Sequence, residues 1–269
     1  MNGKALTLCA DDFAQSPAIS DGILALLQAG RLSATCAMSQ SPHWSALADS
    51  LRQAAVRADI GLHINLTHVF PASRDSIKPL SHWLLMSQLR QLDVAALTDA
   101  MLQQIDRFAD VYGALPDFLD GHQHVHALPQ VRTALFAAIG QRWPKTLRPW
   151  LRAPDKLGHA GDSALKGMIL KTVCHGFARQ ATAQGFAVPA WFGGLYSLTA
   201  EADFPGLMAS WLAACRGHSV MMCHPGLLAE DAADPIGPAR AQEYAYLASD
   251  RFAEDLARHG VSLSRFLPA

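Results

Sequence analysis

Short apolar runs alternate with longer amphipathic segments along most of the chain. The runs that we expect to form buried strands comprise residues 5–10, 33–39, 59–66, 117–122, 150–153, 188–196 and 219–224. Between them, apolar residues recur every three or four positions, which predicts helices with one face on a sheet. These helices are expected between Ser16 and Gly30, over 44–56 and 94–112, after Pro129, and over 163–184, 204–216 and 238–259.

The alternation of strands and helices predicts an α/β protein built from parallel β-α units. About seven such units favour an irregular, TIM-barrel-like (β/α) barrel, with a doubly wound open sheet as the alternative. No linker or low-complexity segment interrupts the 269 residues, so we expect one domain over 1–269. The stretches 68–83 and 225–242 are rich in Pro, Ser and Asp and are expected to be long loops at strand ends.

Polar side chains follow five of the predicted strands where each strand ends. These residues are Asp11, Asp12, His63, Asp120, His122, His124, His126, Arg152 and His224. Because the carboxyl ends of parallel strands open on one face, we expect these side chains to lie close together. Each residue alone has an ordinary structural explanation, such as a turn carboxylate or a core histidine. Together those explanations need five coincidences, which favours a site.

The chemistry of this set favours a divalent metal ion, magnesium or zinc. One Asp and two His would leave coordination positions open, as in a catalytic rather than a structural site. A metal would also offset the repulsion between the adjacent carboxylates Asp11 and Asp12. On a strand, His122, His124 and His126 would share one face, and the pattern leaves open which of them bind one ion.

Composition and charge exclude several classes of partner. Hydrophobic residues make up 50% of the chain, charged residues 17%, and the net charge is −1, so nucleic acid and anionic membranes are not expected partners. No stretch approaches the roughly 20 apolar residues of a membrane span, and the N-terminus lacks a signal-peptide pattern. The five cysteines include no C-x-x-C pair, which indicates reduced, buried thiols. We therefore expect a cytoplasmic protein without membrane insertion.

Five stretches of the sequence resemble those of a known family, the YdjC-like carbohydrate deacetylases. They are ADDFAQSP, GLHINLT, DGHQHVH, LRAP and MCHPG, in this order along nearly the whole chain. The family includes bacterial chitooligosaccharide deacetylase and a hopanoid-associated branch. The resemblance implies an irregular barrel as in polysaccharide deacetylases, a divalent metal, and hydrolysis of N-acetyl groups on a saccharide or glycolipid.

The resemblance also implies roles for individual residues. By residue match, it implies that Asp12, His63 and His122 bind the metal and that Asp11 is the general base. The histidine ligands favour zinc, whereas the family favours magnesium. The sequence departs from the family pattern at Ala14, where the family usually has Gly, and at Gln123, where it often has His. The stretch 155–215 matches nothing known to us and is expected to help set the substrate.

The remaining strand-end residues suggest a mechanism. We expect His224 to protonate the departing amine and Arg152 to orient Asp11 and keep it ionised. The sequence leaves open whether His126 is a further ligand or a supporting group. The aromatic residues of AWFGGLY, which are Trp191, Phe192 and Tyr196, would either stack on a sugar or belong to the core. A homodimer is expected only from the general frequency of symmetric oligomers.

Two other functions fit the same pattern. The first is another metal-dependent barrel enzyme, such as a sugar isomerase or a hydrolase of a non-sugar amide. The second is a metal-containing sugar-binding protein without activity. The adjacent acids Asp11 and Asp12 favour deacetylation over isomerisation, because isomerase sites tend to draw more Glu and Lys to strand ends.

Overall fold

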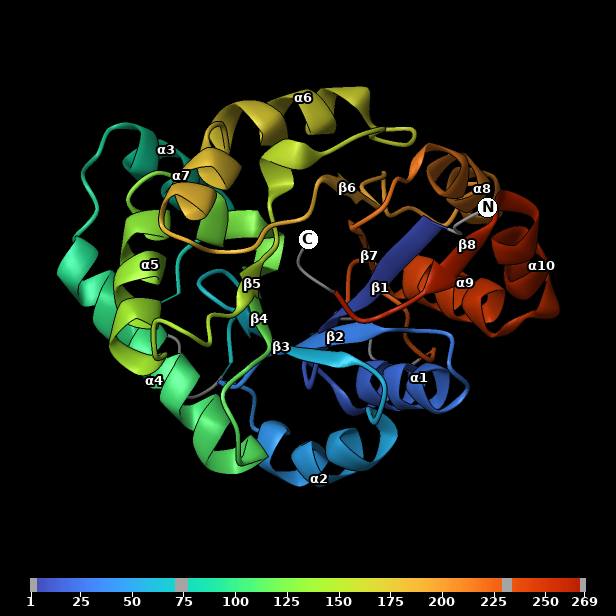
Figure 1. Cartoon of the computed structure of the whole chain (residues 1–269), viewed down its shortest axis with the longest axis horizontal. Coiled ribbons are helices and arrows are strands. Elements are labelled where there is room, and N and C mark those ends of the chain that lie inside the picture. Colours follow the sequence, from blue (N-terminus) through green and yellow to red (C-terminus); the bar gives the residue numbers. More distant parts are fainter. Residues whose placement is uncertain (1–3, 71–76, 229–233, 267–269) are drawn as a thin grey trace.

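The computed structural model describes residues 4–70, 77–228 and 234–266, and its centre is one sheet of parallel strands that curls into an open barrel. Helices cover the outside of the sheet (Figure 1). The strands are β1 (Lys4–Phe13), β2 (Ala34–Ala37), β3 (Asp59–Ile64), β4 (Phe118–Gly121), β5 (Trp150–Leu151), β6 (Trp191–Gly193), β7 (Ser219–Cys223) and β8 (Val261–Leu263). The prediction of an irregular (β/α) barrel is confirmed.

The order of the strands distinguishes a barrel from a doubly wound sheet. The sheet runs β5-β4-β3-β2-β1-β7-β6, so neighbours in sequence are neighbours in space around the ring. A doubly wound sheet would instead reverse direction near its middle. The ladder is interrupted between β5 and β6, where the Leu151 N–H donates to the carbonyl of Ala187 at 2.9 Å. The barrel is therefore irregular at this seam.

Ten α-helices lie within the described ranges. They are α1 (Pro17–Gln28), α2 (Trp44–Ala54), α3 (Leu80–Gln88), α4 (Val94–Tyr112), α5 (Val131–Arg142), α6 (Ala164–Val173), α7 (Phe177–Ala183), α8 (Phe204–Ala214), α9 (Gly237–Ala248) and α10 (Asp250–His259). The predicted cap of α1 is confirmed, since the Ser16 hydroxyl accepts from the Ile19 N–H. Gly113 ends α4 with a φ of 83°.

Three predicted boundaries were wrong. The helix expected over 163–184 is two helices, because the first ends at Val173 and Gly176, with a φ of 78°, directly precedes the second. The helix expected over 238–259 is also two, because Ser249 is extended between α9 and α10. The stretch 68–83 was expected to be a loop, but α3 begins at Leu80 directly after Pro79, while residues 71–76 lie outside the described part.

The histidine tract also differs from its prediction. Strand β4 ends at Gly121, and residues His122–Ala127 form a 3₁₀ segment, η2. Gln123 and His124 have φ values of 53° and 60°, which interrupts any regular alternation. The three histidines therefore do not share one strand face: His122 and His124 line the same cleft, whereas His126 is buried outside its lining. A second 3₁₀ turn, η3 (Pro154–Lys156), follows β5.

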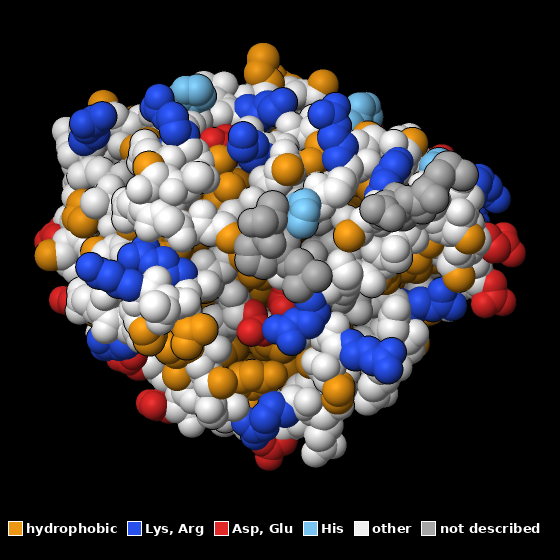
Figure 2. All heavy atoms as spheres, in the orientation of Figure 1, with side chains coloured by type: hydrophobic (Ala, Val, Ile, Leu, Met, Phe, Trp, Pro, Cys, Tyr) orange, Lys and Arg blue, Asp and Glu red, His pale blue; other side chains and the backbone are white. Residues whose placement is uncertain are grey.

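The amino end of the barrel is closed by the last described residues of the chain. Strand β8 pairs with the start of β1, and Phe266 packs on Trp150 with 4.8 Å between ring centroids. Asp59 fixes this segment, accepting from the Phe266 N–H at 2.7 Å. Basic and acidic side chains are both spread over the molecular face in Figure 2. None of the helices in the described ranges is long and apolar enough to cross a membrane.

Candidate active site

Two adjacent carboxylates at the end of β1 face the same cleft because the strand is distorted there. Successive side chains on a regular strand point to opposite faces. Here Asp12 has a φ of 68°, and the pairing of β1 with β2 shifts register between Ala10 and Phe13. Such a bulge re-aims a side chain. Ala14 follows with a φ of 70°, so it adopts the left-handed turn that glycine forms more easily.

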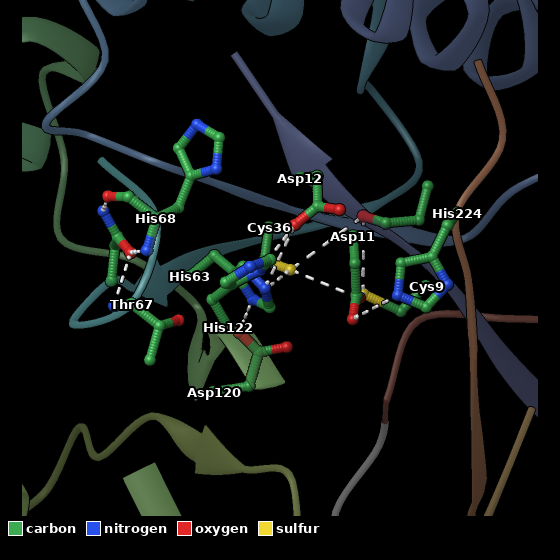
Figure 3. A network of polar contacts seen from close by, with 12 residues as sticks. Cys9, Asp11, Asp12, Cys36, His63, Thr67, His68, Asp120, His122 and His224 are labelled. Carbon is green, nitrogen blue, oxygen red and sulfur yellow. Dashed lines mark hydrogen bonds and ion pairs between the residues drawn. The ribbon is translucent and has the colours of Figure 1, made fainter. Parts of the chain in front are cut away.

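Asp12 lies beside two of the predicted metal ligands. Its Oδ1 is 3.4 Å from His63 Nε2 and 3.2 Å from His122 Nδ1. One ligand atom from each of the three residues lies within 4.8 Å of the other two. Figure 3 shows the three side chains turned toward one another from β1, β3 and the start of η2. This geometry suits a small divalent cation held by one carboxylate and two imidazoles.

Asp120 fixes the orientation of His63. The two residues are direct partners in the β3–β4 ladder, and His63 Nδ1 lies 2.6 Å from Asp120 Oδ1. An Nδ1–H that donates to this carboxylate leaves the Nε2 lone pair directed at the ligand group. Metal-binding histidines usually have such a partner, and it raises their basicity. The position of Asp120 at the strand end was predicted, but this role was not.

The electrostatics of the group favour a positive charge. Burial lowers the pKa of His63, but Asp120 and Asp12 outweigh it and hold that pKa well above its usual value. Burial raises the pKa of Asp12, but Arg240 and the two histidines hold it well below its usual range. A buried position that stabilises a proton on imidazole between carboxylates also stabilises a cation. The residues present therefore fit a divalent metal.

Asp11 is held by a buried arginine, as predicted for Arg152. The guanidinium makes two contacts with the carboxylate, of 2.5 and 2.6 Å, and both side chains are buried. Burial raises the pKa of Asp11, but the opposite effect of Arg152 is larger and the pKa is lowered overall. The carboxylate is therefore ionised. The bidentate pair also fixes the carboxylate plane. Arg152 contacts Asp120 at 2.7 Å as well.

His224 approaches Asp11 from the end of β7. Its Nε2 lies 3.8 Å from Asp11 Oδ2, while its buried Nδ1 has no hydrogen-bond partner among the described residues. Burial lowers the pKa of His224 to about 4, so the imidazole is neutral at pH 7. His224 also lines the cleft, so a neutral imidazole lies there beside the Asp11 carboxylate.

His126 is not brought together with the other predicted ligands. It is fully buried in η2, and its Nε2 lies 2.9 Å from the carbonyl oxygen of Arg152. Its ring packs edge-on against Phe177. This position supports the backbone of Arg152 rather than the group around Asp12. His124 lines the cleft and packs against Phe192.

A second group of potential ligands lies behind Asp11 and comprises Cys9, Asp11, Cys36 and Asp120. Burial raises the pKa of both thiols, so they are neutral. The Arg152 guanidinium already contacts both carboxylates of this group. It supplies the positive charge that a metal would otherwise bring, so we interpret this group as support for Asp11.

Helix α9 contributes two buried charged residues that the sequence analysis missed. Arg240 Nη2 contacts Asp12 Oδ2 at 2.7 Å, and Arg240 Nε contacts Asp234 at 2.6 Å. Glu243, one turn later, accepts from the backbone N–H of His224 at 2.5 Å and from the Tyr196 hydroxyl at 2.7 Å. One face of α9 therefore contacts both Asp12, through Arg240, and the backbone of His224, through Glu243. The available signal was their i, i+3 spacing in the helix predicted over 238–259.

Glu243 gives the fold a pH dependence that can be measured. Burial raises the pKa of Glu243 to about 7, although Tyr196 and His224 donate hydrogen bonds that lower it. Because this pKa is raised in the folded state, its stabilising contribution is complete below the unfolded pKa and is lost as pH rises through about 7. The loss between pH 5 and pH 8 is about 2 to 3 kcal/mol.

Glutamine at position 243 cannot ionise, so this loss should be absent in Glu243→Gln. We expect the free energy of urea unfolding of the variant, relative to the native protein, to increase by about 2 to 3 kcal/mol from pH 5 to pH 8. A constant difference between the two proteins over this range would show that Glu243 has an ordinary pKa.

The site opens into a cleft of about 500 Å³. Its polar residues include Asp11, Asp12, His63, His122, His224 and Arg240. The aromatic residues considered for sugar stacking lie elsewhere: Trp191, Phe192 and Tyr196 are buried in the core, at most 8% exposed. Phe192 lies against the Arg152 guanidinium, 5.7 Å from the ring centroid. Phe192 and Tyr196, whose hydroxyl donates to Glu243, therefore support the site from behind.

Comparison with known proteins agrees with the sequence motifs. The description of the family that matches residues 5–258 is "YdjC-like protein". The chain belongs to the YdjC-like family. This match includes all of the strand-end residues predicted above, and it confirms the resemblance of the five stretches.

Two further comparisons, one with curated sequences and one with solved structures, name proteins to which this chain is similar. Chitooligosaccharide deacetylases of Yersinia pestis (strain Pestoides F) and Yersinia pseudotuberculosis serotype O:1b (strain IP 31758) are each 31% identical over 134 residues, covering 48% of this chain and 53% of those proteins. The chain spans about half the length of the curated relatives it matches. A solved structure of a candidate cellobiose-phosphate cleavage protein from Enterococcus faecalis V583 has a TM-score of 0.72 at 20% identity, over 98% of both chains. That likeness shows the fold alone.

Proposed function

We propose that this YdjC-like protein is a metal-dependent hydrolase that removes the acetyl group from an N-acetylated sugar. The observation that carries the proposal is that two groups of charged and polar side chains lie side by side in one cleft. Asp12, His63 and His122 form a group suited to a cation, and Asp11 lies beside it, held ionised by Arg152. The name of the Yersinia relatives, chitooligosaccharide deacetylase, supports a carbohydrate substrate.

The metal would be held by Asp12, His63 and His122, with magnesium and zinc both compatible with these ligand types. When bound, it would supply Lewis-acid polarisation of the amide carbonyl and lower the pKa of water. Asp120 would orient His63 and Arg240 would orient Asp12 for this purpose. The Arg240 contact also leaves Oδ1 of Asp12 as the oxygen nearer the two imidazoles.

Asp11 would act as the general base on the attacking water. Its ionised carboxylate accepts the proton, and the bidentate Arg152 contact fixes the direction from which it does so. His224 would then deliver a proton to the amine nitrogen as the C–N bond breaks. Because the imidazole is neutral at pH 7, it must first receive a proton, and Asp11 Oδ2 lies 3.8 Å from its Nε2.

Acetate release from a panel of N-acetylated sugars, with and without a chelator, tests the proposal. We expect release that stops on chelation and returns with magnesium or zinc. Release from non-sugar N-acetyl amides alone would point to a different amidase. Sugar binding by the metal-loaded protein without acetate release would instead indicate a binding protein, and either result would overturn the proposal.

A further inference from the structure

The loop that follows β3 is held in place by two buried polar side chains. Asn65 Oδ1 accepts from the N–H groups of Thr67 and His68, at 3.1 and 2.8 Å, and Asn65 Nδ2 donates to the carbonyl of His68 at 2.8 Å. Gln104 of α4 in turn hydrogen-bonds the N–H and the carbonyl of Asn65, at 2.9 and 3.0 Å. An Asn side chain that bonds the backbone ahead of it fixes a turn. Both backbone polar groups of His68 are therefore bonded, which gives this residue a defined position.

This loop presents the imidazole of His68 to the cleft. The half-buried ring lines the cleft and packs edge-on against Phe70 and His122, with 4.6 and 6.0 Å between ring centroids. In Figure 3, His68 and His224 lie on opposite sides of His63 and His122. Within the described ranges, His68 forms hydrogen bonds only through its backbone. Its ring nitrogens can therefore contact a molecule that is bound in the cleft.

The ring of His68 is not placed to bind the metal. One ligand atom from each of Asp12, His63 and His122 lies within 4.8 Å of the other two, and His68 is not part of this group. Beside the group, an imidazole offers an N–H donor and, when neutral, a lone pair that accepts. A hydroxyl group has the same two functions, since it both donates and accepts. The ring therefore fits a hydroxyl-bearing molecule.

A second polar side chain of the cleft favours the same class of ligand. Gln15 lines the cleft, and its Oε1 is buried without a hydrogen-bond partner among the described residues. Buried polar atoms in folded proteins nearly always have a partner, and a carbonyl oxygen can be satisfied only by a donor. A sugar hydroxyl is such a donor, whereas an aliphatic group is not. His68 and Gln15 therefore support one ligand class from two different loops.

We propose that His68 determines specificity in the proposed reaction by hydrogen-bonding a hydroxyl group of the sugar ring that carries the acetamido group. The inference rests on the proposed function and adds a substrate contact to it. Because the ring of His68 adjoins His122, the hydroxyl that it reaches lies close to the reacting amide. Because Asn65 fixes the loop, this contact orients the sugar before the amide reacts.

Sugars that lack one hydroxyl and a substitution that keeps the ring test the inference together. The substrates are methyl N-acetylglucosaminide and the three analogues that each lack one of its hydroxyl groups, assayed for acetate release by the full-length, metal-loaded protein. We expect kcat/KM of the native protein to fall about 3- to 10-fold with at least one analogue, as for the loss of one neutral hydrogen bond. His68→Phe keeps an aromatic ring but removes both nitrogens. It should lose as much with the parent glycoside and show no further loss with that analogue.

Other variants separate this contact from a structural role. His68→Gln retains a donor and an acceptor and should recover part of the dependence on that hydroxyl. His82→Phe is the matched control, because His82 is also half-buried and packs edge-on against an aromatic ring, Trp83, but is not among the residues of the cleft. It should leave kcat/KM for all four glycosides unchanged. The metal content of His68→Phe should equal that of the native protein.

The outcomes distinguish this inference from the proposed function. Acetate release with every hydroxyl preference retained in His68→Phe would overturn the inference and leave the deacetylase proposal intact. Loss of metal from His68→Phe would also overturn the inference, because the ring would then support the cation group. If the native protein releases no acetate, a Kd penalty for one analogue in calorimetry that His68→Phe abolishes would support the contact and overturn the deacetylase proposal. Absence of both release and binding for all four glycosides would overturn both.

Discussion

Replacing His63 with alanine is expected to abolish both metal binding and acetate release. His63 is buried, its Nε2 faces Asp12, and its Nδ1 is fixed by Asp120. Alanine removes one of the three ligands and also leaves the buried Asp120 carboxylate without its partner, His63 Nδ1. Loss of a supporting partner alone typically reduces metal affinity about 10- to 100-fold, so loss of the ligand should exceed that range. Metal content after dialysis and acetate release measure the two effects.

Two further variants show whether a loss of metal in His63→Ala comes from the loss of a ligand. Asp120→Asn keeps the ligand but removes the anionic partner of Nδ1, so metal affinity should fall about 10- to 100-fold while the stoichiometry at saturation is unchanged. His175→Ala removes an exposed histidine and should leave metal content as in the native protein. If His63→Ala retains stoichiometric metal, the assignment of the ligands is wrong.

The convergence of the site was predictable because it depends on topology. In a parallel barrel the carboxyl ends of all strands meet at one end, whatever the detailed packing. Asp11, His63, Arg152 and His224 therefore lie together as expected from strand ends alone. The pairing of His63 with Asp120 follows from the register of β3 and β4, which a single sequence does not specify.

Local backbone conformation was not predictable from the alternation of residues. Asp12 faces the same cleft as Asp11 only because a bulge with a left-handed residue interrupts β1. Two left-handed residues in η2 likewise separate His122 from His126. Strand periodicity describes regular backbone, and it fails at sites where strain re-aims a side chain. The contact of Arg240 with Asp12 joins residues 228 positions apart, so the helix pattern around Arg240 does not specify its partner.

Replacing Asp11 with asparagine is expected to leave metal binding intact and to reduce kcat for acetate release about 10²- to 10⁴-fold. Asparagine has nearly the same shape but cannot accept a proton from water at neutral pH. Arg152 would still contact Asp120, so its guanidinium would not be left unpaired. The lost charged hydrogen bonds should lower the free energy of unfolding by about 1.5 to 3 kcal/mol. Metal content, kcat and urea unfolding separate these effects.

The chain contains a matched control for this substitution on its surface. Asp106 also forms a bidentate pair with an arginine, Arg142, at 2.6 and 2.8 Å, but both side chains are partly exposed. Asp106→Asn should leave kcat unchanged and have little effect on the free energy of unfolding, because water screens the pair. A comparable loss of kcat in both variants would mean that the loss in Asp11→Asn comes from a less stable fold and not from the loss of a general base. A loss confined to Asp11→Asn, with metal retained, is the result that a general base requires, because removing a ligand would release the metal as well.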